Sequence, residues 1–112
     1  MSGTTQIARG NIILEMLFAV PLTPNGGTAI AANTSVENTY TLPGVALNDF
    51  LEINKNTHQT GLSIGNIRAS AANTIAIQWI NSTTASITPT ADTFLIALTR
   101  AEGPSLPSAL QQ

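Results

Sequence analysis

The most constraining feature of the sequence is the apolar segment TIAIQWIN at residues 74–81. Its alternate residues Ile75, Ile77 and Trp79 share one face, and the positions between them are also largely apolar, as at Ile80. A short run of β-branched and aromatic residues that is apolar on both parities is typical of a strand covered on both sides. The segment therefore predicts a strand at the centre of a sheet, with Trp79 in the core.

Other strand-like segments surround this one and are separated by turn residues. Pro43-Gly44 has the residues of a type II turn, and Gly65 interrupts a strand pattern as a β-bulge does. About seven or eight short strands at this spacing are typical of a small antiparallel β-sandwich or a jelly-roll-like barrel. We therefore predict an all-β fold, with further strands at residues 28–32, 36–42, 45–55 (with a bend at 48–49), 62–70 and 92–100.

Residues 11–20 (NIILEMLFAV) fit both a helix and a strand. Met16 and Val20 lie at helical spacing, whereas Leu14, Met16 and Phe18 alternate as in a strand. Periodicity does not separate the two structures in so short a run. We favour a strand because the segments around it are strands.

The tetrapeptide Ala-Ala-Asn-Thr occurs twice, at residues 31–34 and 71–74. It is either the trace of a duplicated half or one kind of turn used twice. The flanking residues do not match, which favours two similar turns.

The chain carries little charge and no cysteine. Charged residues make up 9% of the sequence, against about 25% in an average protein. The net charge is −2 without a basic run, so no nucleic-acid partner is expected. A weakly charged chain that is 43% hydrophobic suggests a surface covered by partners. The alternative is a soluble monomer with a neutral surface rich in Thr and Asn.

Both ends of the sequence lack the pattern of a strand or helix. We expect an extended arm at residues 1–10, a β domain at residues 11–100 and a tail at residues 101–112. Neither end can fold on itself, so we expect contacts with partner subunits there, at Thr4, Gln6, Arg9, Ser105, Leu106 and Leu110.

No segment has the length of a membrane helix. The longest apolar run, residues 12–22, is interrupted by Glu15 and Pro21, and a membrane helix needs roughly 20 apolar residues. Glu15 inside this run and the single positive residue before it, Arg9, disfavour a cleaved signal peptide. No membrane partner is expected.

Residues able to support catalysis are few and scattered. His58 is the only histidine, and a triad with Asp49 or Glu52 and Ser63 lacks any nucleophile motif. The same groups match no metal-ligand spacing. We therefore expect no enzyme activity, no metal site and no cofactor. The sequons at Asn33 and Asn81 are expected by chance in a chain rich in Asn and Thr.

Residues 39–55 and 59–91 resemble a group of small virion structural proteins of tailed bacteriophages. The likeness lies mainly in LPG at residues 42–44, SAANT at residues 70–74 and ITPTA at residues 87–91. These short segments contain no motif of a catalytic or binding site. No functional residue of the group is therefore assigned to this sequence.

This resemblance implies a capsid decoration or cement protein, located on the capsid surface of the virion. The expected partner is the major capsid protein, and a homotrimer is the expected oligomer. The alternative is a tail or fibre binding module that contacts another virion protein or a host glycan.

Overall fold

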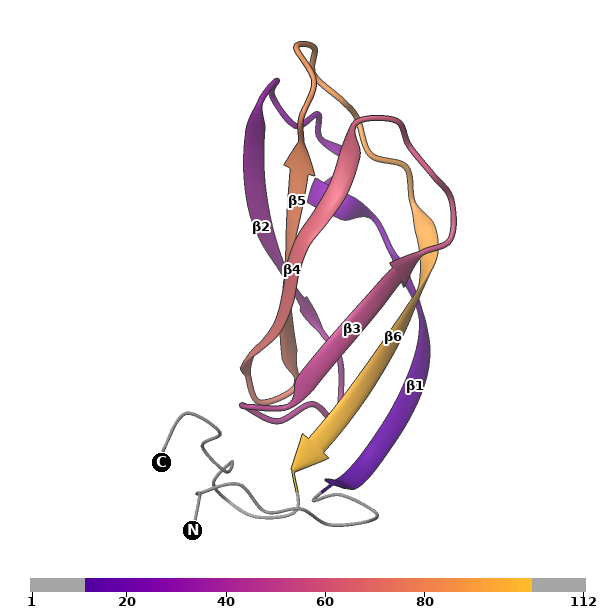
Figure 1. Ribbon diagram of the computed structural model, residues 1–112, viewed down its shortest axis with the longest axis vertical. Helices are drawn as coiled ribbons and strands as arrows, with labels where there is room; N and C mark the ends of the chain where they lie inside the picture. Colours follow the sequence, from indigo (N-terminus) through magenta and orange to yellow (C-terminus); the bar gives the residue numbers. More distant parts are fainter. Residues whose placement is uncertain (1–11, 102–112) are drawn as a thin grey trace, which may run out of the picture.

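The computed structural model describes residues 12–101, which form two three-stranded antiparallel sheets packed face to face (Figure 1). The strand orders are β1-β6-β3 and β2-β5-β4, and every pairing is antiparallel. This confirms the predicted all-β sandwich. The elements are β1 (Ile12–Leu22), the 3-10 helix η1 (Pro24–Gly27), β2 (Thr34–Thr41), β3 (Phe50–Lys55), β4 (Leu62–Ala71), β5 (Thr74–Asn81) and β6 (Asp92–Ala101).

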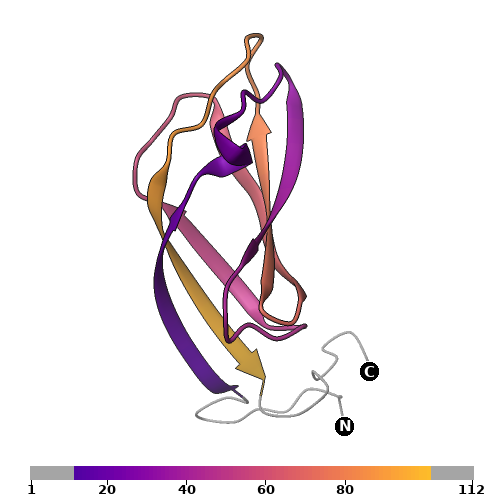
Figure 2. The ribbon, with the colours of Figure 1, turned by 180° about the vertical axis from the view of Figure 1, so that it is seen from behind.

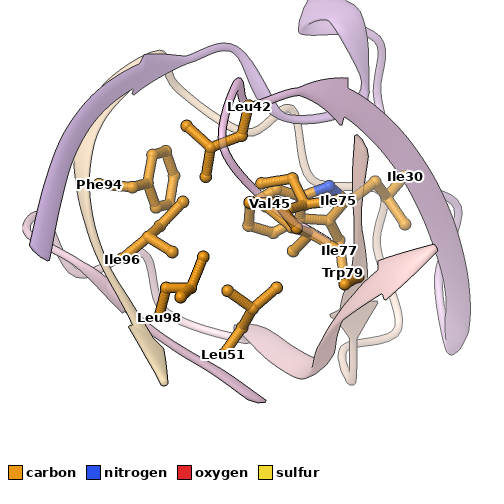
Figure 3. Packing of buried hydrophobic residues seen from close by; sticks show 11 residues of the cluster. Ile30, Leu42, Val45, Leu51, Ile75, Ile77, Trp79, Phe94, Ile96 and Leu98 are labelled. Atoms are coloured by element: carbon orange, nitrogen blue, oxygen red, sulfur yellow. The ribbon is translucent and has the colours of Figure 1, made fainter. Parts of the chain in front are cut away.

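The core lies between the two central strands, β5 and β6 (Figure 3). Trp79 of β5 is fully buried, and its ring lies 5.6 Å from that of Phe94 of β6 at a tilted angle. The indole Nε1 has no hydrogen-bond partner among the described residues, so this side chain stabilises the fold mainly by apolar packing. The central, buried strand predicted at residues 74–81 is therefore confirmed.

β1 resolves the ambiguity of residues 11–20 in favour of a strand. It runs antiparallel to β6 from the pair Ile12–Ala101 to the pair Leu22–Asp92. Phe18 and Val20 pack against the core, as the alternating pattern requires. The strand includes Pro21, which an edge strand tolerates because one side of its backbone needs no partner.

The two Ala-Ala-Asn-Thr segments form the same kind of turn. Asn33 and Asn73 both have positive φ, 52° and 57°. The hydroxyls of Thr34 and Thr74 each donate to the carbonyl two residues earlier, at 2.9 and 3.1 Å. Asparagine tolerates this left-handed backbone better than most residues do. One turn is thus used twice, once before β2 and once before β5.

Two predicted strand segments were wrong. Residues 28–32 form only an isolated bridge between Ile30 and Ile87. Residues 45–49 form a loop, because the Asp49 carboxylate accepts a hydrogen bond from Ala46 N at 2.8 Å and Asn48 has a φ of 75°. The described chain therefore has six strands, and the last extends one residue past the predicted boundary at residue 100. Figure 2 shows these connections from behind.

The predicted bulge at Gly65 is confirmed. The β4–β5 register shifts between Ile64 and Asn66. A Cβ at position 65 would meet the ends of the Gln78 and Ile80 side chains, which cover this stretch of β4. Glycine therefore lets two neighbouring side chains lie over the backbone.

Gly61→Ala is expected to lower the free energy of unfolding by about 2 kcal/mol. Gly61 has a φ of 84°, and an added Cβ would overlap the Thr83 methyl group and lie 3.2 Å from Ile87. Thr83 has little room to move because its hydroxyl donates to Asn81 Oδ1 at 2.7 Å. Urea unfolding followed by circular dichroism measures the loss.

Gly44→Ala is the matched control for this prediction. Gly44 has a φ of 99° and nothing within 4 Å of the added Cβ. It carries the backbone strain without the overlap, so its loss should be about 1 kcal/mol. Equal losses in the two variants would show that contact with Thr83 is unimportant.

Candidate interaction surface

The outer face of the β1-β6-β3 sheet exposes large apolar side chains between polar ones, which include Glu15, Glu52 and Asn54. Leu17 of β1 is 73% exposed and Phe50 of β3 is 63% exposed. On this face they are accompanied by Ala19, Leu95 and Ala97, while the intervening residues of each strand point into the core. We call these five residues the apolar face.

The register of the sheet shapes the apolar face into a groove. Leu17 lies opposite Ala97, and Phe50 lies opposite Thr99. Ala97 of the central strand is thus flanked by Leu17 of β1 and by Glu52 of β3, so this groove has one apolar wall and one acidic wall. A hollow of about 240 Å³ lies between β1 and β6, lined by Glu15, Met16, Leu17, Ala97, Leu98 and Thr99.

The outer face of the β2-β5-β4 sheet is polar by contrast. Arg68 of β4 donates from Nε and from one terminal nitrogen to the Glu37 carboxylate of β2, at 3.0 and 2.9 Å. The pair spans the central strand at Ala76, which is completely buried. The hydrogen bond from the Arg68 guanidinium lowers the pKa of the Glu37 carboxyl. The Arg68–Glu37 ion pair therefore covers part of this face, whereas no such pair among the described residues covers the apolar face.

The contact residues predicted from the sequence lie outside the described residues. The described chain begins and ends side by side, because Ile12 pairs with Ala101 at one end of the sheet. A contact role therefore stays a prediction for the six residues named from the sequence: Thr4, Gln6, Arg9, Ser105, Leu106 and Leu110.

The structure does not assemble the triad considered from the sequence. Asp49 precedes β3 and is bound by Arg100, whereas His58 follows β3 at its other end. Glu52 lies between them, on the outer side of the sheet. Residues 12–101 contain no group of three or more His, Asp or Glu side chains that could hold a metal ion.

His58 and Ser63 do line one common pocket of about 290 Å³, between the end of β3 and the start of β4. The loop that forms it is held in place by Asp92, which accepts from Thr57 N at 2.8 Å and lies 3.5 Å from Lys55 Nζ. The other lining residues are polar or aliphatic: Lys55, Asn56, Thr57, Gln59, Leu62 and Ile64.

Within the described part of the chain, no helix is long and apolar enough to span a membrane. No protein-family model, curated protein or solved structure matches the sequence.

Sequence reasoning missed the apolar face, although the sequence contained a signal for it. Residues 16–20 and 94–98 are apolar on both parities. In a two-layer sandwich only one parity reaches the core. The other parity, which includes Leu17 and Ala97, must therefore face outward and be apolar.

Proposed function

We propose that the protein is a structural virion protein that decorates and stabilises a bacteriophage capsid by bridging capsid subunits. The observation that carries the proposal is the apolar face, with Leu17 and Phe50 exposed on a chain of only 9% charged residues. Exposed apolar patches rimmed by polar residues mark protein interaction sites. The resemblance to phage virion proteins supplies the kind of partner, the major capsid protein.

The physical basis of such a function is burial of apolar surface against the capsid. Burial contributes roughly 25 cal/mol per Å² of apolar area removed from water. A side chain such as Phe50, with 63% of its surface exposed, has most of that contribution still to gain. Many weak copies on one shell act together, because neighbouring contacts raise the effective concentration. The homotrimer implied by the resemblance stays a prediction.

The test is co-sedimentation of the purified protein with capsids that lack it. Phe50→Lys should weaken capsid binding about tenfold or more, because it replaces an apolar contact of about 1.5–3 kcal/mol by a charge. The control is Thr41→Lys, at an exposed position of β2 in the other sheet. Capsids carrying the wild type should also resist heating better than bare ones.

Failure of the wild type to bind capsids, or equal binding by Phe50→Lys and the wild type, would overturn the proposal. Immunogold labelling of virions separates it from the tail or fibre alternative. Label on the tail would replace the capsid assignment. Such a module could use the pocket beside His58, but no Trp, Tyr or Phe side chain lines that pocket for a sugar ring to stack on. The capsid proposal is therefore favoured.

A further inference from the structure

Three of the four edge strands are protected against pairing with another chain. β3 is short, with six residues, and contains Lys55. β4 has register shifts at two places and carries Arg68. η1 lies against the middle of β2, where Asn25 N donates to Asn38 Oδ1 at 2.9 Å. Short length, bulges, charges and covering segments are the usual means of blocking edge-to-edge association.

β1 lacks these protections over its middle. It is the longest strand, with 11 residues, and among the described strands it is bonded only to β6. Its register shift lies between Ile12 and Leu14, and its proline is Pro21. Between them, residues 14–20 pair with β6 without interruption and contain a single charged residue, Glu15. Among residues 12–101, no strand pairs with the other side of this segment, so its outward backbone groups are available to a partner strand.

We propose that β1 pairs antiparallel with β1 of a second copy of this chain, across a twofold axis at Leu17. The two sheets would then join into one of six strands, in the order β3-β6-β1-β1-β6-β3. The proposal concerns an interface between copies and does not rest on the capsid function. It is an alternative to the homotrimer that the resemblance implies, and the two are separated by the mass of the wild type in solution.

The sequence of the edge is complementary to itself in this register. Leu17 is the middle residue of 14–20 and faces Leu17 of the second copy. Glu15 faces Ala19 rather than another Glu15, so the only charge of the segment meets no like charge directly opposite. Centring the pair on Glu15 would place two carboxylates opposite each other. A shift by one residue would set inward side chains against outward ones.

The inner row of side chains also gains from this pairing. Met16 belongs to the core-facing parity of β1 and is nevertheless 40% exposed. In the proposed register it faces Phe18 of the second copy, and a thioether beside an aromatic ring is a favourable contact. Leu14 faces Val20 in the same way. Both parities of β1 thus find apolar partners, and the apolar faces of the two copies become continuous.

Cysteine cross-linking tests the register directly, because the chain contains no cysteine. Facing residues of an antiparallel pair have Cα atoms about 4.5–5.5 Å apart, within the range of about 4.4–6.8 Å that a disulfide bridges. Leu17→Cys should therefore form a covalent dimer on mild oxidation. Thr39→Cys, at an exposed position of the edge strand β2, is the control and should stay uncross-linked.

Introducing a positive or a negative charge at position 17 tests the proposed twofold axis. Leu17→Lys and Leu17→Glu should each weaken the dimer at least about tenfold, since each places like charges opposite each other. An equimolar mixture of the two should restore it, because Lys then faces Glu. Sedimentation velocity measures the mass, and thermal unfolding checks that each variant is folded, as expected for a side chain that is 73% exposed.

A dimer in the wild type, a cross-link at position 17 and rescue by the mixture would establish the proposal. It is overturned by a wild type that sediments as a monomer or as a trimer. It is also overturned if Leu17→Cys and Thr39→Cys cross-link equally, or if the Lys and Glu variants fail to associate when mixed.

Discussion

Asn81→Leu is expected to lower the free energy of unfolding by about 3–4 kcal/mol. Asn81 is 1% exposed and ends β5. Its Nδ2 lies within hydrogen-bond distance of the carbonyls of Ile30, Ala31 and Ala85, at 3.0, 3.2 and 2.9 Å. Its Oδ1 accepts from the backbone N–H and the hydroxyl of Thr83, at 2.9 and 2.7 Å. Leucine removes all these bonds. The Ile30 carbonyl keeps its bond from Ile87 N, and the Thr83 hydroxyl still donates to the Ala85 carbonyl. The Ala31 carbonyl and the Thr83 N–H lose their partners, at a cost of about 1–3 kcal/mol for each group left unsatisfied.

Urea unfolding followed by circular dichroism measures this loss. Asn66→Leu, at an exposed position of β4, is the control and should change the stability by less than about 0.5 kcal/mol. A loss below about 1 kcal/mol at Asn81 would contradict the view that this side chain holds the two loops together. The buried position also means that the sequon at Asn81 cannot be glycosylated in the folded protein.

Asn81 also shows where prediction from the sequence ends. The sequence predicts β5 because a segment that is apolar on both parities has few other structures open to it. It predicts the two Ala-Ala-Asn-Thr turns because asparagine tolerates positive φ. These are local properties. Within residues 28–33, the Asn81 side chain provides hydrogen bonds that strand pairing would otherwise provide. Its partners Ile30 and Ala31 lie 51 and 50 positions away in the chain. No local pattern contains that information.

The candidate surface was less predictable than the fold for a related reason. An apolar residue in a strand contributes to the core or to an outer face according to the partner sheet, which the sequence does not name. Leu17 and Met16 are therefore equally apolar in the sequence but differ in the structure, at 73% and 40% exposed.

A second contact between distant parts of the chain joins Asp49 to Arg100. The Asp49 side chain is 2% exposed and that of Arg100 is 33% exposed. Arg100 donates from Nε to Oδ1 and from a terminal nitrogen to Oδ2, both at 2.7 Å, and also to the carbonyl of Gly44 at 2.8 Å. Such a two-pronged pair is among the strongest side-chain contacts. It fastens the loop before β3 to the end of β6.

Asp49→Asn is expected to lower the free energy of unfolding by about 3 kcal/mol at neutral pH. The amide offers one acceptor where the carboxylate offered two, and its NH2 group would face either the guanidinium or Ala46 N. The buried loop then loses its anchor. Glu37→Gln is the control, because it removes one carboxylate from a two-pronged pair that lies on the open surface. There we expect no measurable loss, since water and salt screen the pair.

The loss caused by Asp49→Asn should also depend on pH in a defined direction. Hydrogen bonds from Arg100 lower the pKa of the Asp49 carboxyl below its ordinary value of 3.8, against the effect of burial, and the Ala46 N–H adds to the lowering. A lowered pKa in the folded state contributes stability that is present above the unfolded pKa and is lost as the pH falls through the folded one. The free energy of unfolding of the wild type should therefore exceed that of the variant by the full difference at about pH 6. The difference should become progressively smaller below about pH 4. Urea midpoints measured across that range test this, and a margin that is the same at both ends would show that the ionised carboxylate is not its source.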